Sequence, residues 1–105
     1  SPDELDLYAS TFERTGFRGG INWYRNVDEN ARRYPGVGVQ QLDLPTLMIC
    51  AEWDPALPPA LAADMGDRCS DLEMHIVPKA GHWVQHESPE EVNDLIVDWL
   101  GRRFL

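Results

Sequence analysis

The sequence of 105 residues lacks any apolar run of about 18 or more residues, so it contains no membrane-spanning helix. It begins Ser1-Pro2-Asp3, without an initiator methionine and without the basic start and apolar stretch of a secretion signal, which suggests a processed or excised chain. Basic residues are few: nine Lys and Arg stand against 18 Asp and Glu, a formal charge of −9. Nucleic acids and anionic membrane surfaces bind positive patches, so the sequence argues against both kinds of partner.

Cysteine is also scarce. The two cysteines, Cys50 and Cys69, form no Cys-x-x-Cys pair, and two thiols alone do not make a metal site. His82 and His86 are four residues apart, but no helix or third ligand supports a metal there, so we expect no metal. Cys50 lies in an apolar run, where a thiol is usually a small buried hydrophobe. The simplest interpretation is a reducing, cytoplasmic location.

The first half of the chain has helical periodicity. Residues 1–4, Ser-Pro-Asp-Glu, have the form of a capping box with proline in the first helical position, which predicts a helix over residues 1–15 that stops at Gly16. Apolar residues at helical spacing predict a second helix over residues 21–34, ended by Pro35-Gly36. Residues 36–45 have no clear period and are interpreted as a linker.

The second half has a different pattern. The continuous apolar run over residues 46–51 predicts a strand buried on both faces, and residues 73–78 predict a second strand. A short helix is expected over residues 59–66, and the sequence Ser-Pro-Glu-Glu at residues 88–91 predicts another capping box before an amphipathic final helix. This alternation indicates a βαβ unit with parallel strands. Two strands alone do not make a stable parallel sheet with both faces covered. The chain is therefore expected to be the C-terminal piece of a larger α/β domain, with its first half placed elsewhere as a lid.

Asp54 and His82 each lie in a loop that follows a predicted strand. Functional groups of open α/β sheets gather outside the carboxyl ends of the strands, so these two residues could form a His–carboxylate pair in which the acid orients the imidazole as a general base. Each residue also has a simpler interpretation. Asp before proline is common in turns, and a histidine after glycine is common in surface loops.

Aromatic residues give two further candidates. Tyr8 lies on the apolar face of the first predicted helix, where its hydroxyl needs a partner; an aromatic residue at this spacing can equally be a packing residue. Trp53 and Trp83 flank the candidate acid and histidine, and could form the wall of a pocket.

Three stretches resemble the soluble epoxide hydrolases of the α/β-hydrolase fold. The first, YASTFERTGFRGGINWYRN over residues 8–26, contains the specific pattern GFRGxxNWYRN of the cap region. The second, PTLMICAEWD over residues 45–54, is similar to the strand and loop that carry the triad acid. The third, Gly81-His82-Trp83 with the downstream PEEVN, is similar to the catalytic-histidine loop and last helix. The order, acid before histidine, is also that of the α/β-hydrolases.

The resemblance implies a division into a helical cap segment, residues 1–41, and the C-terminal part of an α/β-hydrolase core, residues 42–105, with its last parallel strands and helices. It also implies hydrolysis of a small-molecule epoxide, of lipid or xenobiotic origin, to a vicinal diol through an alkyl-enzyme ester. Tyr8 then corresponds to one of two tyrosines that donate to the epoxide oxygen, Asp54 to the triad acid and His82 to the general base. Trp83 would line the pocket. This chemistry requires no cofactor or metal.

Several parts of the family's site are not found in this sequence. The loop with the Asp nucleophile, the HGxP oxyanion loop and the first cap tyrosine all precede the region of resemblance. The prediction is therefore that the N-terminal half of the hydrolase domain is missing and that this chain alone is inactive. Two alternatives stay open: a dehalogenase or esterase of the same fold, and a non-catalytic hydrolase-like binding module.

Overall fold

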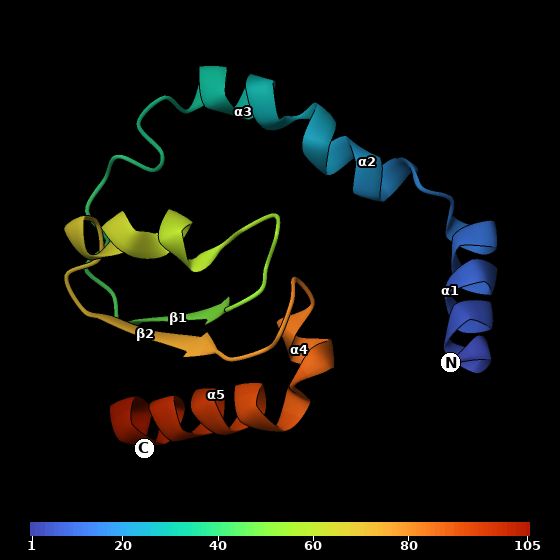
Figure 1. Cartoon of the computed structure of the whole chain (residues 1–105). Coiled ribbons are helices and arrows are strands. Elements are labelled where there is room, and N and C mark those ends of the chain that lie inside the picture. The colour runs from blue at the N-terminus through green and yellow to red at the C-terminus, as the bar shows by residue number, and fades with distance from the viewer. The chain divides into compact units, whose positions relative to one another are not determined.

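The computed structural model describes residues 1–105, which divide into two units, Ser1–Gly38 and Val39–Leu105. The first unit contains three helices, α1 (Pro2–Thr15), α2 (Arg18–Arg25) and α3 (Val27–Arg33), shown in blue to green in Figure 1. None of the three helices has a buried residue. No helix anywhere in the chain has both the length and the apolarity that a membrane crossing requires.

The capping box predicted at the start of α1 is confirmed. The Ser1 hydroxyl accepts a hydrogen bond from the Glu4 amide at 3.3 Å, and the Glu4 carboxylate accepts one from the Ser1 amino group at 2.6 Å. The helix stops at Gly16, as predicted, with φ +67° and its amide donating to the Phe12 carbonyl at 2.7 Å. A positive φ is a conformation that glycine adopts without strain, which explains the stop.

The prediction of one continuous helix over residues 21–34 is wrong, because the helix breaks at Asn26 between α2 and α3. The Asn26 side-chain amide donates to the Asn22 carbonyl at 2.8 Å, the same oxygen that its backbone amide reaches at 3.1 Å. A side chain that competes for helix carbonyls in this way disfavours an uninterrupted helix.

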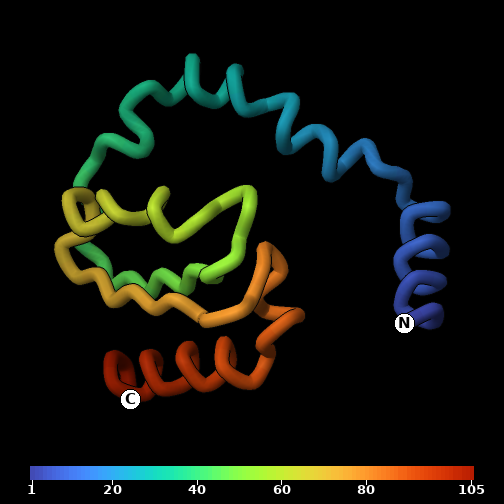
Figure 2. The backbone as a smooth tube through the Cα atoms, in the orientation of Figure 1, coloured from blue at the N-terminus to red at the C-terminus, as the bar shows by residue number.

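The second unit contains β1 (Thr46–Ala51), the 3₁₀ helix η1 (Pro59–Asp67), β2 (Leu72–Val77), α4 (Val84–Glu87) and α5 (Pro89–Phe104). The strands β1 and β2 are parallel, as predicted, in a two-stranded sheet whose register runs from Thr46 opposite Leu72 to Ala51 opposite Val77. Figure 2 shows the chain leaving β1, passing through η1 and entering β2 in the same direction. The crossover predicted as a short helix over residues 59–66 is therefore present as a 3₁₀ helix.

Two layers cover the sheet, with η1 on one side and α5 on the other (Figure 1). Alternate residues of β1 face the two layers. Ile49 and Ala51 pack in the core with Val77, Ala80 and α5, and Met48 and Cys50 line a cavity against η1. This alternation follows from the two-residue period of a strand. The parallel pairing places the carboxyl ends of both strands at the same end of the unit.

Two further predictions about the second unit need correction. The strand β1 was expected to be buried on both faces, but only Cys50 and Ala51 are buried, since the sheet has no third strand beside it. Ser88 was expected to cap the last helix, but its side chain makes no capping hydrogen bond. Ser88 instead ends α4, which the sequence did not predict, and its amide donates to the Val84 carbonyl at 2.9 Å. Pro89 does occupy the start of α5 as predicted.

Candidate functional site

Asp54 lies three residues after the end of β1 and is buried, with 8% of its surface exposed. Its Oδ1 accepts hydrogen bonds from the Ala56 amide at 2.8 Å and the Leu57 amide at 2.9 Å. Such a turn, in which an aspartate bonds to backbone amides two and three residues ahead, is a local preference of Asp. The carboxylate is therefore oriented by its own loop.

His82 lies in the loop after β2, and the structure brings it to Asp54. The His82 Nδ1 lies 2.9 Å from Asp54 Oδ2 and 3.1 Å from Asp54 Oδ1. The imidazole is 41% exposed, whereas the acid beneath it is buried. The contact joins residues 28 apart in sequence, and it exists because parallel strands bring their carboxyl-terminal loops to one edge of the sheet.

The charge on Asp54 decides which nitrogen of the His82 ring carries a proton. The Leu57 amide lowers the pKa of Asp54, with further lowering by the Ala56 amide and by His82, and together these outweigh the opposing effect of burial. An ionised carboxylate only accepts hydrogen bonds, so the Nδ1 of His82 must carry the proton in their contact. In the neutral imidazole this leaves a lone pair on Nε2. The arrangement is that of a histidine oriented to accept a proton.

Backbone hydrogen bonds hold the two loops together. The Glu52 amide donates to the Val77 carbonyl at 3.0 Å, and the Trp53 amide donates to the Ala80 carbonyl at 2.9 Å. In addition, the Glu52 carboxylate accepts from the Lys79 amide at 2.8 Å. Lys79 has φ +57°, an uncommon conformation for a residue other than glycine. The acid loop thus fixes the path of the histidine loop.

Glu87 binds the histidine loop and is a residue that the sequence analysis missed. Its carboxylate accepts from the Gly81 amide at 2.8 Å and from the Trp83 amide at 3.2 Å. The helix that carries it, α4, has four residues, which is too short for periodicity to reveal. The one available signal is an acidic residue six positions after the glycine of the Gly-His-Trp motif.

The two predicted residues outside the acid–histidine pair are both exposed. Trp83 lies beside His82, with ring centroids 5.4 Å apart in an edge-to-face arrangement. Tyr8 lies on α1 in the first unit, where 57% of its surface is exposed. The described contacts therefore join Asp54, His82 and Trp83 within the second unit, and Tyr8 belongs to the other unit.

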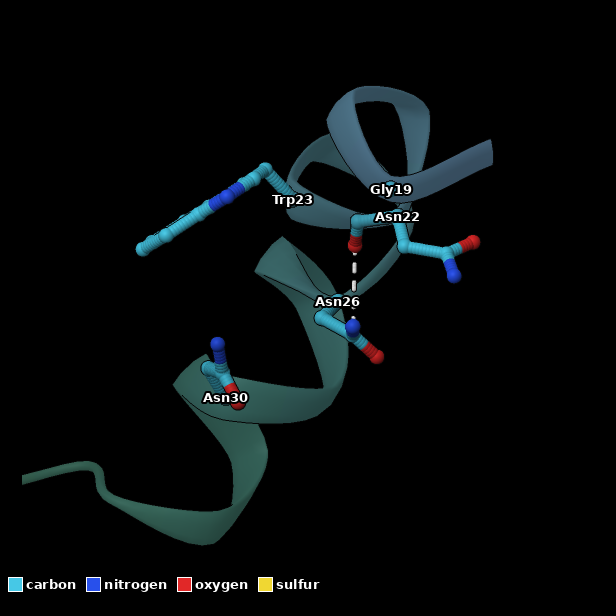
Figure 3. A pocket seen from close by; sticks show the side chains of 5 residues that line it. All are labelled: Gly19, Asn22, Trp23, Asn26 and Asn30. Carbon is cyan, nitrogen blue, oxygen red and sulfur yellow. Dashed lines mark hydrogen bonds between the residues drawn. The ribbon is translucent and has the colours of Figure 1, made fainter. Parts of the chain in front are cut away.

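The first unit has a pocket of its own, of about 300 Å³. Figure 3 shows its lining, in which Trp23 lies across from a row of asparagines; the lining residues are Gly19, Asn22, Trp23, Asn26 and Asn30. Neutral amides donate and accept hydrogen bonds but do not exchange protons at ordinary pH. This pocket therefore offers binding groups without an acid, a base or a nucleophile.

Comparison with known proteins adds the following. A family model described as alpha/beta hydrolase fold matches residues 2–89. Bifunctional epoxide hydrolase 2 of Mus musculus is 37% identical over 99 residues, which cover 93% of this chain and 18% of that protein. Epoxide hydrolase A of Mycobacterium tuberculosis is 35% identical over 105 residues, which cover 95% of this chain and 31% of that protein.

Solved structures give a consistent result. The crystal structure of epoxide hydrolase A from Mycobacterium thermoresistibile superimposes with a TM-score of 0.84 at 35% identity, covering 95% of this chain and 32% of that one. An alpha/beta hydrolase enzyme from a lagoon-sediment metagenome, at 24% identity and a TM-score of 0.67, shares the fold. The chain spans between about a fifth and a third of the length of the epoxide hydrolases named here.

Proposed function

Since this chain belongs to the α/β-hydrolase fold family, we propose that it supplies the acid and the general base of an epoxide-hydrolysing site in a longer protein. The observation that carries the proposal is the hydrogen bond between Asp54 and His82 at the carboxyl ends of two parallel strands. The similarity to epoxide hydrolases over most of the chain supports the choice of an epoxide over other substrates.

The proposed reaction has two steps. A nucleophilic carboxylate from a segment outside this chain attacks an epoxide carbon, the carbon–oxygen bond opens, and an alkyl-enzyme ester forms. The Tyr8 hydroxyl donates a hydrogen bond to the oxygen that leaves the carbon. The ring oxygen then takes a proton from solvent and becomes the first hydroxyl of the diol. A phenolic O–H is a hydrogen-bond donor and can make this donation.

In the second step, His82 acts as the general base. Its Nε2 takes a proton from a water molecule, and the resulting hydroxide equivalent attacks the carbonyl carbon of the ester. The ester bond breaks, the departing alkoxide takes the proton of the hydroxyl that has added to the carbonyl carbon, and the diol leaves with the nucleophilic carboxylate restored. The imidazolium returns its proton to solvent. Asp54 keeps the proton of the neutral imidazole on Nδ1 and stabilises the imidazolium that forms. Trp83, beside His82, is proposed to line the substrate pocket.

The same proposal assigns residues 1–41 to the cap region and residues 42–105 to the end of the hydrolase core. It also predicts that the 105-residue chain alone releases no diol, since the nucleophile lies outside it.

Single-turnover kinetics on the full-length protein would test these roles with an epoxide substrate. We expect His82→Gln to accumulate the ester and to slow diol release by about 10²–10⁴-fold, the usual contribution of a general base. His75→Gln is the matched control, because His75 lies on β2 and contacts Glu73, not Asp54; this variant should release diol at the normal rate. Diol release that survives His82→Gln would contradict the assignment.

Tyr8→Phe tests the substrate class. Loss of one donor to a developing oxyanion typically lowers the rate by about 10²–10³-fold, and here the loss should fall on ester formation. An enzyme that forms its ester equally well without the Tyr8 hydroxyl would instead be a dehalogenase or esterase of the same fold.

A further inference from the structure

The two backbone amides that flank His82 share one acceptor. The Glu87 Oε2 accepts from the Gly81 amide at 2.8 Å, and the Glu87 Oε1 accepts from the Trp83 amide at 3.2 Å. Each oxygen of one carboxylate therefore holds the backbone on one side of the histidine. Hydrogen bonds to an ionised acceptor are stronger than those between neutral groups.

The packing at Gly81 is fitted to this carboxylate. A Cβ added at Gly81 would lie 3.1 Å from Glu87 Oε1 and 3.2 Å from Oε2. Gly81 is not among the residues with a positive φ, so the backbone conformation itself does not demand glycine there. The absence of a side chain at Gly81 instead leaves room for the Glu87 carboxylate to reach both amides.

Asp54 and Glu87 constrain different parts of His82, the ring and the backbone. Asp54 accepts a hydrogen bond from the ring at Nδ1, whereas the hydrogen bonds of the Glu87 carboxylate go to the backbone amides of Gly81 and Trp83. A ring held only at Nδ1 can still swing about that hydrogen bond, so the direction of Nε2 depends on where the backbone places the Cα and Cβ atoms. Glu87 acts on that placement. The Glu87 amide also donates to the Trp83 carbonyl at 3.0 Å, which ties α4 to the same loop.

We propose that Glu87 is a positioning residue for His82, which fixes the backbone on both sides of the histidine and thereby aims Nε2 at the attacking water. The proposal rests on the proposed function for its kinetic consequence, and on the loop geometry alone for its structural one. Glu87 does not touch the substrate. Its effect falls on the second step, hydrolysis of the ester, and not on the first.

The test uses three variants of the full-length protein. Glu87→Gln keeps the size of the side chain and removes its charge and one acceptor oxygen. Gly81→Ala leaves Glu87 in place and displaces its carboxylate through the added Cβ. Glu90→Gln is the matched control, since it removes an exposed carboxylate on the first turn of α5 that contacts neither amide.

We expect Glu87→Gln and Gly81→Ala to slow ester hydrolysis by about 10–100-fold, as misplacement of a catalytic group by about an ångström does, with ester formation and kcat/KM nearly unchanged. Glu90→Gln should match the parent protein in both steps. A structural role alone would lower the amount of folded enzyme and would not separate the two steps.

Nuclear magnetic resonance of the His82 ring gives a second readout that needs no activity. The Nδ1 proton bonded to Asp54 should give a sharp signal in the parent protein and in Glu90→Gln, and a broadened or shifted signal in Glu87→Gln and Gly81→Ala. If the parent protein hydrolyses no epoxide, the proposed function fails and this signal still decides the role of Glu87.

Two results would overturn the proposal. One is an unchanged His82 signal and unchanged ester hydrolysis in Glu87→Gln and Gly81→Ala. The other is loss of cooperative unfolding in Glu87→Gln while folded Gly81→Ala keeps the normal His82 signal, which would give Glu87 a purely structural role.

Discussion

The helices α1 and α5 are of similar length but differ in what stabilises them. The first has a complete capping box and buries no residue, whereas α5 has no side-chain cap and buries Val92 and Trp99. A cap satisfies the free amides at the end of a helix and depends only on neighbouring residues. Burial depends on a partner surface, which α5 finds on the sheet. A clear helix signal in sequence therefore says little about whether the helix is packed.

The same difference separates the two units. The second unit has a core of Ala51, Val77, Ala80 and Val92, whereas the helices of the first unit expose apolar side chains such as Leu5, Phe17 and Trp23. Extended exposed apolar surfaces are typical of regions that contact another part of a protein. This agrees with the proposal that residues 1–41 are part of a cap region, in which these apolar side chains would contact other segments of a longer protein.

The largest effect expected from this comparison is at Val77, which has 0% of its surface exposed. Val77→Asp buries an unpaired charge and should destabilise the second unit by about 3–5 kcal/mol. Val27→Asp, at an exposed position on α3, should change the free energy of unfolding by less than about 0.5 kcal/mol. Urea unfolding of the 105-residue chain, followed by circular dichroism, measures both. Equal losses at the two positions would mean that the units do not differ in packing.

A smaller effect is expected where α5 is joined to β2. The Arg102 guanidinium donates to both Glu73 carboxylate oxygens, at 2.6 and 3.1 Å, and with His75 it lowers the pKa of Glu73 from 4.5 to about 2. Because the folded-state pKa lies below the unfolded one, this contact stabilises the fold above about pH 4.5, and the stabilisation is lost as the pH falls toward 2.

Glu73→Gln should therefore lower Tm at pH 7 and have little effect near pH 2, as measured by thermal unfolding across this range. Glu90→Gln, which removes a carboxylate of α5 outside this contact, is the control and should show no such trend. A Glu73→Gln difference that is independent of pH would show that the ion pair is not the source of the stabilisation.

The smallest effect is at the helix ends. Ser1→Ala removes the hydroxyl that accepts from the Glu4 amide and should weaken α1 by about 1 kcal/mol, seen as lost ellipticity at the helical band. Ser88→Ala, at a similar sequence pattern without the hydrogen bond, should leave the helical signal unchanged. A loss at Ser88 equal to that at Ser1 would mean that the pattern itself caps α5.

These contrasts show what the sequence could and could not predict. The parallel pairing of β1 and β2 was predictable because short apolar runs separated by a crossover have few other arrangements. The contact of Asp54 with His82 followed from that topology. The α4 helix and the break at Asn26 were not predictable, because one is too short for periodicity and the other depends on a side chain competing for a carbonyl. Residues 88–91 have the sequence of a capping box, but the Ser88 backbone ends α4.

The hydrogen bonds of Asp54 differ greatly in the length of chain that each one closes. Those to Ala56 and Leu57 span two and three residues, whereas the bond to His82 spans 28. The loop-closure entropy of a span of that length is about 3 kcal/mol plus a constant, and the pairing of β1 with β2 bears it before His82 meets Asp54. The acid can therefore take its orientation from a handful of neighbouring residues, and only the arrival of His82 depends on the sheet having formed.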